Sequence, residues 1–113
     1  MRRLREAAAR DLGIPVPDAF VALLLMSNGL DINYASFLDA QRLVPENLTA
    51  PRPGVLVLGR SLGNPDLPTE YVFDPRTNQF HEVLAGNPDA RLTSFDTFEE
   101  LLVAVLSEAG RIG

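Results

Sequence analysis

Residues 19–26 form an uninterrupted apolar run of eight residues, AFVALLLM, that stops abruptly at the polar sequence SNG. Because a membrane-spanning helix needs roughly 18 to 20 apolar residues, this run is too short to cross a bilayer. A secretory signal is also disfavoured, since Glu6 and Asp11 interrupt the basic leader and no small-residue cleavage site follows the run. A helix that is apolar on all sides is normally enclosed by protein. The pattern therefore predicts that residues 18–27 form the most buried element of the fold.

Helical patterns also occur at both ends of the chain. Residues 2–12 carry apolar side chains at helical spacing, which predicts a surface helix whose arginines lie in water. The apolar helix that follows should end at a cap formed by Asn28 and the left-handed Gly29. These two elements place a pair of helices at the start of the fold.

The predicted C-terminal helix has the clearest start signal. Thr97 and Glu100 match a capping box, with Ser94 and Asp96 as alternative N-caps, and Gly110 is the expected end. One apolar stripe at helical spacing is formed by Phe98, Leu101, Leu102, Val105 and Leu106. We expect this stripe to pack the helix on a sheet.

Strand patterns occupy the middle of the chain. Residues 55–59, VLVLG, are typical of a buried strand that ends at Gly59. Segments 71–73 and 80–83 flank the sequence DPRTNQ, in which Asp74 begins a turn, and this arrangement predicts a hairpin.

The remaining segments have weaker patterns. Residues 32–38 are expected to form a first strand, and residues 39–48 a helical turn or an irregular crossing. Turn-forming residues predict loops over 60–70 and 85–93. Helices first, strands in the middle and a helix last indicate an α+β fold. We predict two N-terminal helices, a mostly antiparallel sheet of about four to six strands, and a C-terminal helix packed on it.

Length and charge narrow the function classes. The 113 residues suit a single domain, 1–113, and the lack of cysteine fits a reducing compartment, here the cytoplasm. The net charge is −5, but the first ten residues carry +3, which leaves −8 on the rest. Such a body would repel phosphate backbones, so we expect a basic protein partner rather than nucleic acid or a membrane. The alternative is that the acidity serves only solubility.

Residues that could support catalysis or metal binding are sparse. A general base at His81 would need a partner from elsewhere in the fold, so a partly exposed strand histidine is the preferred interpretation. One histidine and no cysteine leave only carboxylates as metal ligands, and no D-x-D-x-D-G loop is present. Neither Ser61 nor Ser94 stands in a G-x-S-x-G context. We therefore expect a protein that is not an enzyme and has no metal or cofactor.

Several landmarks of the chain resemble, in their order and spacing, those of the SUKH superfamily. The N-terminal signature of that superfamily resembles LGIPVPDAFVALLLMSNGLDIN, and its central strand ending in glycine resembles VLVLG. Its hairpin is similar to YVFDPRTNQF, and the start of its last helix is similar to TSFDTFEELLVAVL. The resemblance covers about residues 10–106, and NGLDIN is most similar to the YrhA-like branch.

The resemblance implies a non-enzymatic function. SUKH domains are mostly bacterial immunity proteins that bind and neutralise a cognate toxin, and a minority serve as intracellular scaffold or regulatory domains. An acidic surface suits the first role, because a toxin directed at nucleic acid presents a basic cleft. The landmark residues with an expected structural role are Asn28, Gly29, Gly59, Ser94 and Phe95. Exposed loops between them should contact the partner. The candidate partner-binding residues are Asp31, Asn33, Tyr34, Asp66, Glu70 and Asp74.

Overall fold

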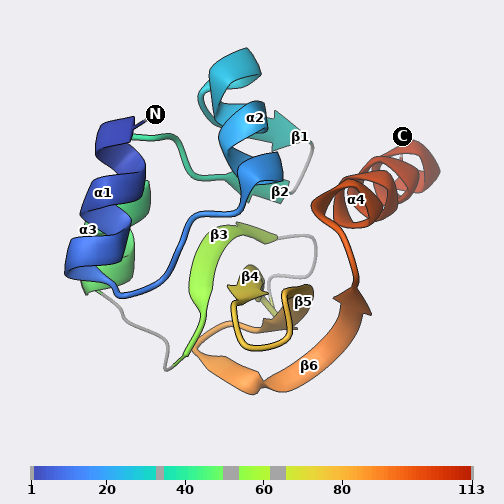
Figure 1. The fold of residues 1–113 in the computed structure, drawn as a ribbon. Helices are drawn as coiled ribbons and strands as arrows, with labels where there is room; N and C mark the ends of the chain where they lie inside the picture. The colour runs from blue at the N-terminus through green and yellow to red at the C-terminus, as the bar shows by residue number, and fades with distance from the viewer. Residues whose placement is uncertain (1, 33–34, 50–53, 62–65, 113) are drawn as a thin grey trace.

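The computed structural model describes residues 2–32, 35–49, 54–61 and 66–112 of the chain. Four helices and six strands are drawn in Figure 1: α1 (Arg2–Asp11), α2 (Asp18–Ser27), β1 (Leu30–Ile32), β2 (Ala35–Phe37), α3 (Leu43–Thr49), β3 (Leu56–Ser61), β4 (Thr69–Asp74), β5 (Gln79–Leu84), β6 (Asn87–Phe95) and α4 (Phe98–Ile112). The described strands form one antiparallel sheet in the order β1-β2-β3-β4-β5-β6. The predicted α+β fold is confirmed.

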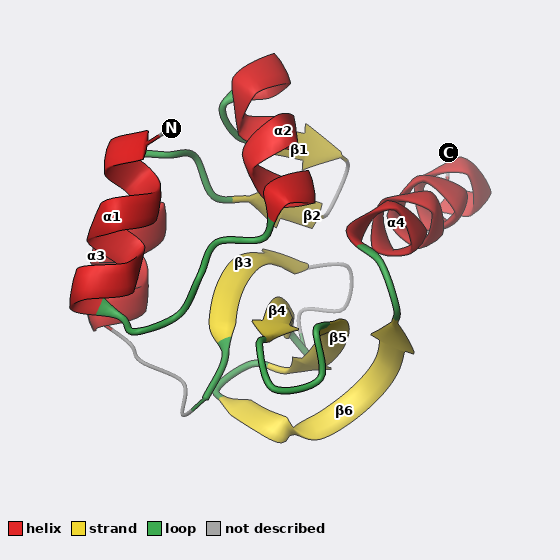
Figure 2. Ribbon diagram, viewed as in Figure 1, coloured by secondary structure: helices red, strands yellow, loops and turns green. Residues whose placement is uncertain are grey.

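The helices surround one face of a curved sheet. Helices α1 and α3 lie side by side on one flank, α4 lies on the other, and α2 lies between them (Figure 1). Figure 2 shows that the long strand β6 bends around the end of the sheet. None of the helices in the described ranges is long and apolar enough to cross a membrane.

The main core is organised around the ring of Phe98 at the start of α4. Its centroid lies 5.5 Å from that of Phe20, 5.8 Å from that of Phe37 and 5.6 Å from that of Phe80. Aromatic pairs at such distances add about 0.5–1.5 kcal/mol beyond the area they bury. These contacts join α2, β2 and β5 to the first turn of α4, which is how the C-terminal helix is anchored on the sheet.

A second, smaller cluster lies on the opposite face of the sheet and consists of Val55, Val57, Val72 and Val83. Successive side chains of a strand point to opposite faces, so Phe73 enters the main core while Val72 enters the valine cluster. Strand β4 is therefore buried at all six positions.

The prediction that residues 18–27 form the most buried element is wrong. Helix α2 buries Phe20, Val21 and Leu24, but Leu25 is 70% exposed and Met26 is 86% exposed. The physical reason is that a helix lying on a sheet buries one face, whereas a central strand such as β4 has neighbours on both edges and apolar clusters on both faces.

Gly59 has a structural role that differs from the predicted one. It does not end a strand but lies inside β3, beside the register shift that separates Val57 from Gly59. A Cβ atom there would lie 2.5 Å from the carbonyl oxygen of Ser36 and 2.9 Å from the ring of Phe37. Only glycine therefore allows β2 to approach β3 this closely, and the rings of Phe37 and Tyr71 stack nearby at 5.4 Å.

The helix caps agree with the sequence in part. The amide of Asn28 donates to the carbonyl of Leu24 at 2.9 Å and Gly29 has a φ of 101°, so the predicted cap of α2 is confirmed. The capping box of α4 is confirmed in its Thr97 half, whereas the side chain of Glu100 reaches one residue further back than predicted. The amide of Glu100 donates to Thr97 Oγ1 at 3.2 Å, and Glu100 accepts from the amide of Asp96 at 3.1 Å.

Other boundaries differ from the predictions. Residues 85–93, predicted as a loop, contribute most of β6, because two register shifts let this polar segment pair with β5. Ser94 lies in β6 and is not a helix cap, whereas Phe95 packs partly buried against the main core. Helix α4 continues past Gly110 to Ile112. The hairpin of β4 and β5 is confirmed, and Asp74 starts its turn by accepting the amide of Arg76 at 2.9 Å.

Candidate protein-binding surface

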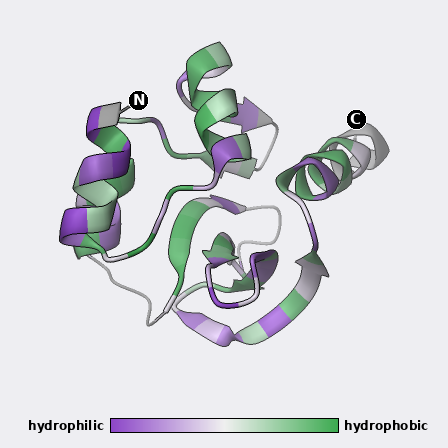
Figure 3. Ribbon diagram, viewed as in Figure 1, coloured by the Kyte–Doolittle hydropathy of each residue, from purple (hydrophilic) through white to green (hydrophobic). Residues whose placement is uncertain are grey.

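The C-terminal half of α2 exposes an apolar face that we call the α2 patch, formed by Ala22, Leu25 and Met26. These residues are spaced i, i+3 and i+4, so they share one side of the helix. Figure 3 shows the hydrophobic colour running to the end of α2 that projects away from the sheet. Exposed apolar side chains that are contiguous mark interaction sites more often than scattered ones do.

Two carboxylates lie close to the end of α2, and we call them the acidic rim: Asp31 and Asp39. Asp31 is exposed on β1 and accepts a hydrogen bond from Ser36 Oγ at 2.6 Å. Asp39 lies against the turn after α2, since a Cβ atom on Gly29 would be 3.3 Å from Asp39 Cβ. Within the described part of the chain, no ion pair involves either carboxylate.

A hydrogen bond fixes the position of the rim relative to the patch. The amide of Ala40 donates to Oδ1 of Asn28 at 2.9 Å, which ties the segment after β2 to the cap of α2. Oδ1 of Asp39 in turn accepts the amide of Arg42 at 2.8 Å, just before α3. These two backbone-to-side-chain hydrogen bonds link the segment that carries Asp39 to the cap of α2 and to the start of α3.

The raised pKa of Arg42 indicates a negative potential in this region. Its pKa is raised, first by its hydrogen bond to Glu46 and the charge of that residue, and also by the charges of Asp39 and Asp31. Its guanidinium is already committed to Glu46, at 2.9 Å, and Glu46 also pairs with Arg60 at 3.0 Å. The two rim carboxylates therefore keep their charge available to a basic partner.

The structure separates the predicted partner-binding residues into three groups. Asp31 and Asp66 are exposed, and Asn33 and Tyr34 lie outside the described residues. Glu70 and Asp74 are buried in β4, at 6% and 0% exposure. The expectation that these last two face a partner is wrong, because both face inward on a strand that is covered on both sides.

Both buried carboxylates instead hold the fold together. Glu70 accepts the amide of Gly86 at 3.0 Å, which fixes the turn before β6. Asp74 pairs with Arg76 and with Arg91, each at 3.4 Å. Burial alone would raise the pKa of Asp74, but the hydrogen bonds from Arg76 and the charges of both arginines together hold it below its usual value.

His81 is buried, which corrects the prediction of a partly exposed strand histidine. It is 1% exposed because Val72 on β4 and Ser94 on β6 flank it in the sheet. Its Nδ1 lies 2.8 Å from Ser94 Oγ, whereas Nε2 is buried and has no hydrogen-bond partner among the residues that the structure describes. Burial lowers the pKa of His81, the charge of Arg91 lowers it further, and the charge of Asp74 opposes both.

The pair of His81 and Ser94 resembles two members of a catalytic triad. Among the described residues, no third group is placed to complete the triad. An activated serine needs a base whose second nitrogen is oriented by a further group. Here Nε2 of His81 meets no such group, and the carboxylate of Asp74 is occupied by arginines. The pair therefore acts as a hydrogen bond between β5 and β6.

Comparison with family models, curated proteins and solved structures finds no match to this chain. The α2 patch and Asp39 were missed by the sequence reasoning. The run AFVALLLM contains no polar residue that would distinguish an exposed Leu25 from a buried Leu24. Asp39 could not be predicted because it lies far along the chain from the cap of α2. The two are brought together only in the fold, where the amide of Ala40 donates to Asn28.

Proposed function

We propose that this chain is a non-enzymatic protein-binding domain and, as its resemblance to the SUKH superfamily implies, a bacterial immunity protein that neutralises a cognate toxin in the cytoplasm. The α2 patch bordered by the acidic rim carries the proposal. Interfaces commonly combine an apolar centre with a polar rim. Leu25 and Met26 provide such a centre on α2, and the exposed Asp31 lies on the strand that follows this helix.

The charge of the rim suggests the chemistry of the partner. Complementary potentials accelerate encounter and select the partner, while a buried apolar centre supplies most of the affinity. A toxin that acts on nucleic acid needs a basic surface to hold phosphates. The α2 patch and acidic rim would cover such a surface, with apolar contact at the centre and carboxylates facing lysines or arginines.

The test first looks for a toxin domain encoded beside the gene of this protein, which the proposal predicts. Co-expression should protect cells, and the purified proteins should form a one-to-one complex. The double variant Leu25→Gln/Met26→Gln should weaken the dissociation constant at least about tenfold, as measured by calorimetry. Leu92→Gln is the matched control, because Leu92 is also an exposed apolar side chain, at 50%, but lies on β6.

The acidic rim is tested by measuring the rate of association with the toxin domain. Reversing the charge of the exposed rim residue Asp31 to Lys should slow association and weaken its dependence on salt, while the fold survives. A toxin that kills equally with and without this protein would refute the immunity function. The scaffold or regulatory role would then be the better proposal, and a gene neighbourhood of housekeeping functions would support it.

A further inference from the structure

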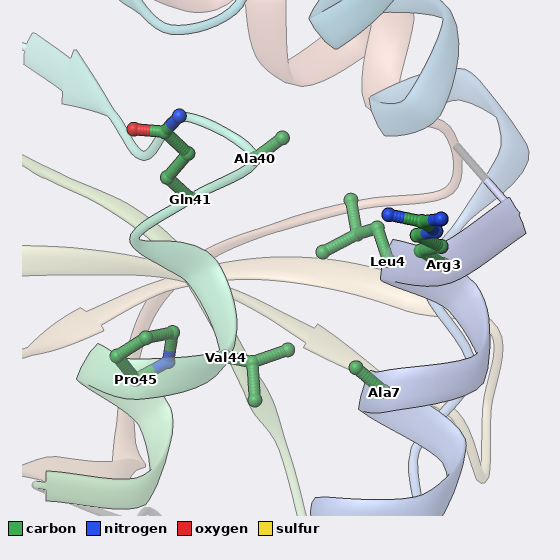
Figure 4. Close-up of a pocket in the computed structure, with 7 residues that line it drawn as sticks. All are labelled: Arg3, Leu4, Ala7, Ala40, Gln41, Val44 and Pro45. Carbon is green, nitrogen blue, oxygen red and sulfur yellow. The ribbon is translucent and has the colours of Figure 1, made fainter.

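A groove with a volume of about 490 Å³ lies between α1 and α3 and is separate from the α2 patch. Figure 4 shows Leu4 and Ala7 of α1 facing Val44 of α3 across it. Pro45 and Ala40 extend its apolar wall, and Arg3 and Gln41 supply its polar groups. The volume lies in the range of about 300–1,000 Å³ that is typical of small-molecule sites.

The groove is preformed. Leu4 and Val44, which face each other across the groove, are each 8% exposed and pack in the main core. The segment after β2, which contributes Ala40 and Gln41 to the lining, is tied to the cap of α2 because the amide of Ala40 donates to Asn28. A ligand would therefore meet fixed walls and would not have to order them, which lowers the cost of binding.

Arg3 distinguishes this groove from an ordinary gap between helices. Of the α1 arginines whose side chains the structure describes, Arg5 pairs with Asp18 and Arg10 pairs with Asp11, both at 3.0 Å. Arg3 has no ion pair or hydrogen bond within the described part of the chain, and Figure 4 shows it beside Leu4 at the groove. A guanidinium binds a carboxylate through two parallel hydrogen bonds.

We infer that this groove binds a small carboxylic acid with an apolar tail. The tail lies between Leu4, Ala7 and Val44, and the carboxylate pairs with Arg3. The opposite charge sign sets this site apart from the acidic rim, which suits a basic partner. The two sites therefore recognise different chemistries and can be tested separately.

The first test titrates octanoate into the labelled protein and follows the methyl resonances of Leu4, Ala7 and Val44 by nuclear magnetic resonance. Saturable shifts are expected with octanoate. Octanol lacks the charge, so its affinity should be at least tenfold weaker. Equal affinities for the two probes, or shifts elsewhere only, would overturn the inference. Shifts that follow protein concentration and not octanoate would show that a second copy occupies the groove, and would also overturn it.

The second test uses paired variants of the same helix. Arg3→Gln should weaken octanoate binding at least fivefold and leave octanol binding unchanged. Arg5→Gln is the matched control and should change neither, because Arg5 lies outside the lining and is paired with Asp18. Ala7→Leu should block both probes by filling the groove. An Arg3→Gln variant that binds octanoate like the parent, with an unchanged melting temperature, would refute the role of this arginine.

Discussion

Helix α2 and strand β4 have burial patterns opposite to what their compositions suggest. The helix, DAFVALLLMS, is apolar through its middle, yet it leaves Leu25 and Met26 in solvent. The strand, TEYVFD, contains two carboxylates, yet every one of its residues is buried. The difference shows that burial is decided by how many layers cover an element and only secondarily by its composition.

The same comparison separates structural from functional residues. A buried carboxylate is stable only when hydrogen bonds and opposite charges replace its water, and Glu70 and Asp74 each have such partners. An exposed leucine or methionine has no such structural requirement. The surface at the end of α2 is therefore the better candidate for recognition, and the carboxylates of β4 are part of the framework.

The largest effect is expected from the two neighbouring leucines of α2. Leu24→Asp places an unpaired charge at a side chain that is 2% exposed, and should cost more than about 4 kcal/mol and unfold the protein. Leu25→Asp should cost about 1 kcal/mol or less, because this side chain is 70% exposed. Urea unfolding followed by circular dichroism measures both. Similar costs for the two variants would show that the exposed face of α2 is packed in solution.

A smaller effect is expected from the carboxylates. Asp74→Asn removes the charge between Arg76 and Arg91 at a fully buried position, and should cost about 1–3 kcal/mol. Asp31→Asn, at an exposed position, should change the free energy of unfolding by about 0.5 kcal/mol or less. An Asp74→Asn variant as stable as the parent would contradict the framework role of this carboxylate.

The elements that were predictable from the sequence carry their signals locally. The capping box of Thr97 and Glu100 and the hairpin around Asp74 each depend on residues within one turn. Strand β6 was missed because its residues alternate poorly and become a strand only by pairing with β5. The role of Gly59 was predicted wrongly because Ser36, which approaches it closely, lies on a strand more than twenty positions earlier in the chain.

The candidate surface was predictable only in part. Asp31 follows a helix cap that the sequence identifies, so its exposure at the end of a helix could be expected. Glu70 and Asp74 flank turn-rich loops and resemble exposed residues by that criterion. Their burial depends on the second apolar cluster, whose four valines come from three different strands or their ends. No local pattern reveals a cover that is assembled from distant segments.

The smallest effect concerns pH and the one histidine of the chain. Burial and the charge of Arg91 hold the pKa of His81 below the ordinary value of 6.5. Above that value the ring is neutral in both the folded and the unfolded states, so the free energy of unfolding is unaffected. As the pH falls below it, the unfolded chain takes up the proton first, and stability declines until the folded-state pKa is passed.

His81→Gln should remove this decline, because glutamine does not titrate. Urea unfolding of the parent and the variant, measured at several pH values on both sides of about 6.5, compares their slopes. The overall stability of the variant can change through its contact with Ser94, so the slope and not the absolute value is decisive. A parent protein that gains stability on mild acidification, or a variant that keeps the parent's slope, would show that His81 is not the buried neutral group of β5.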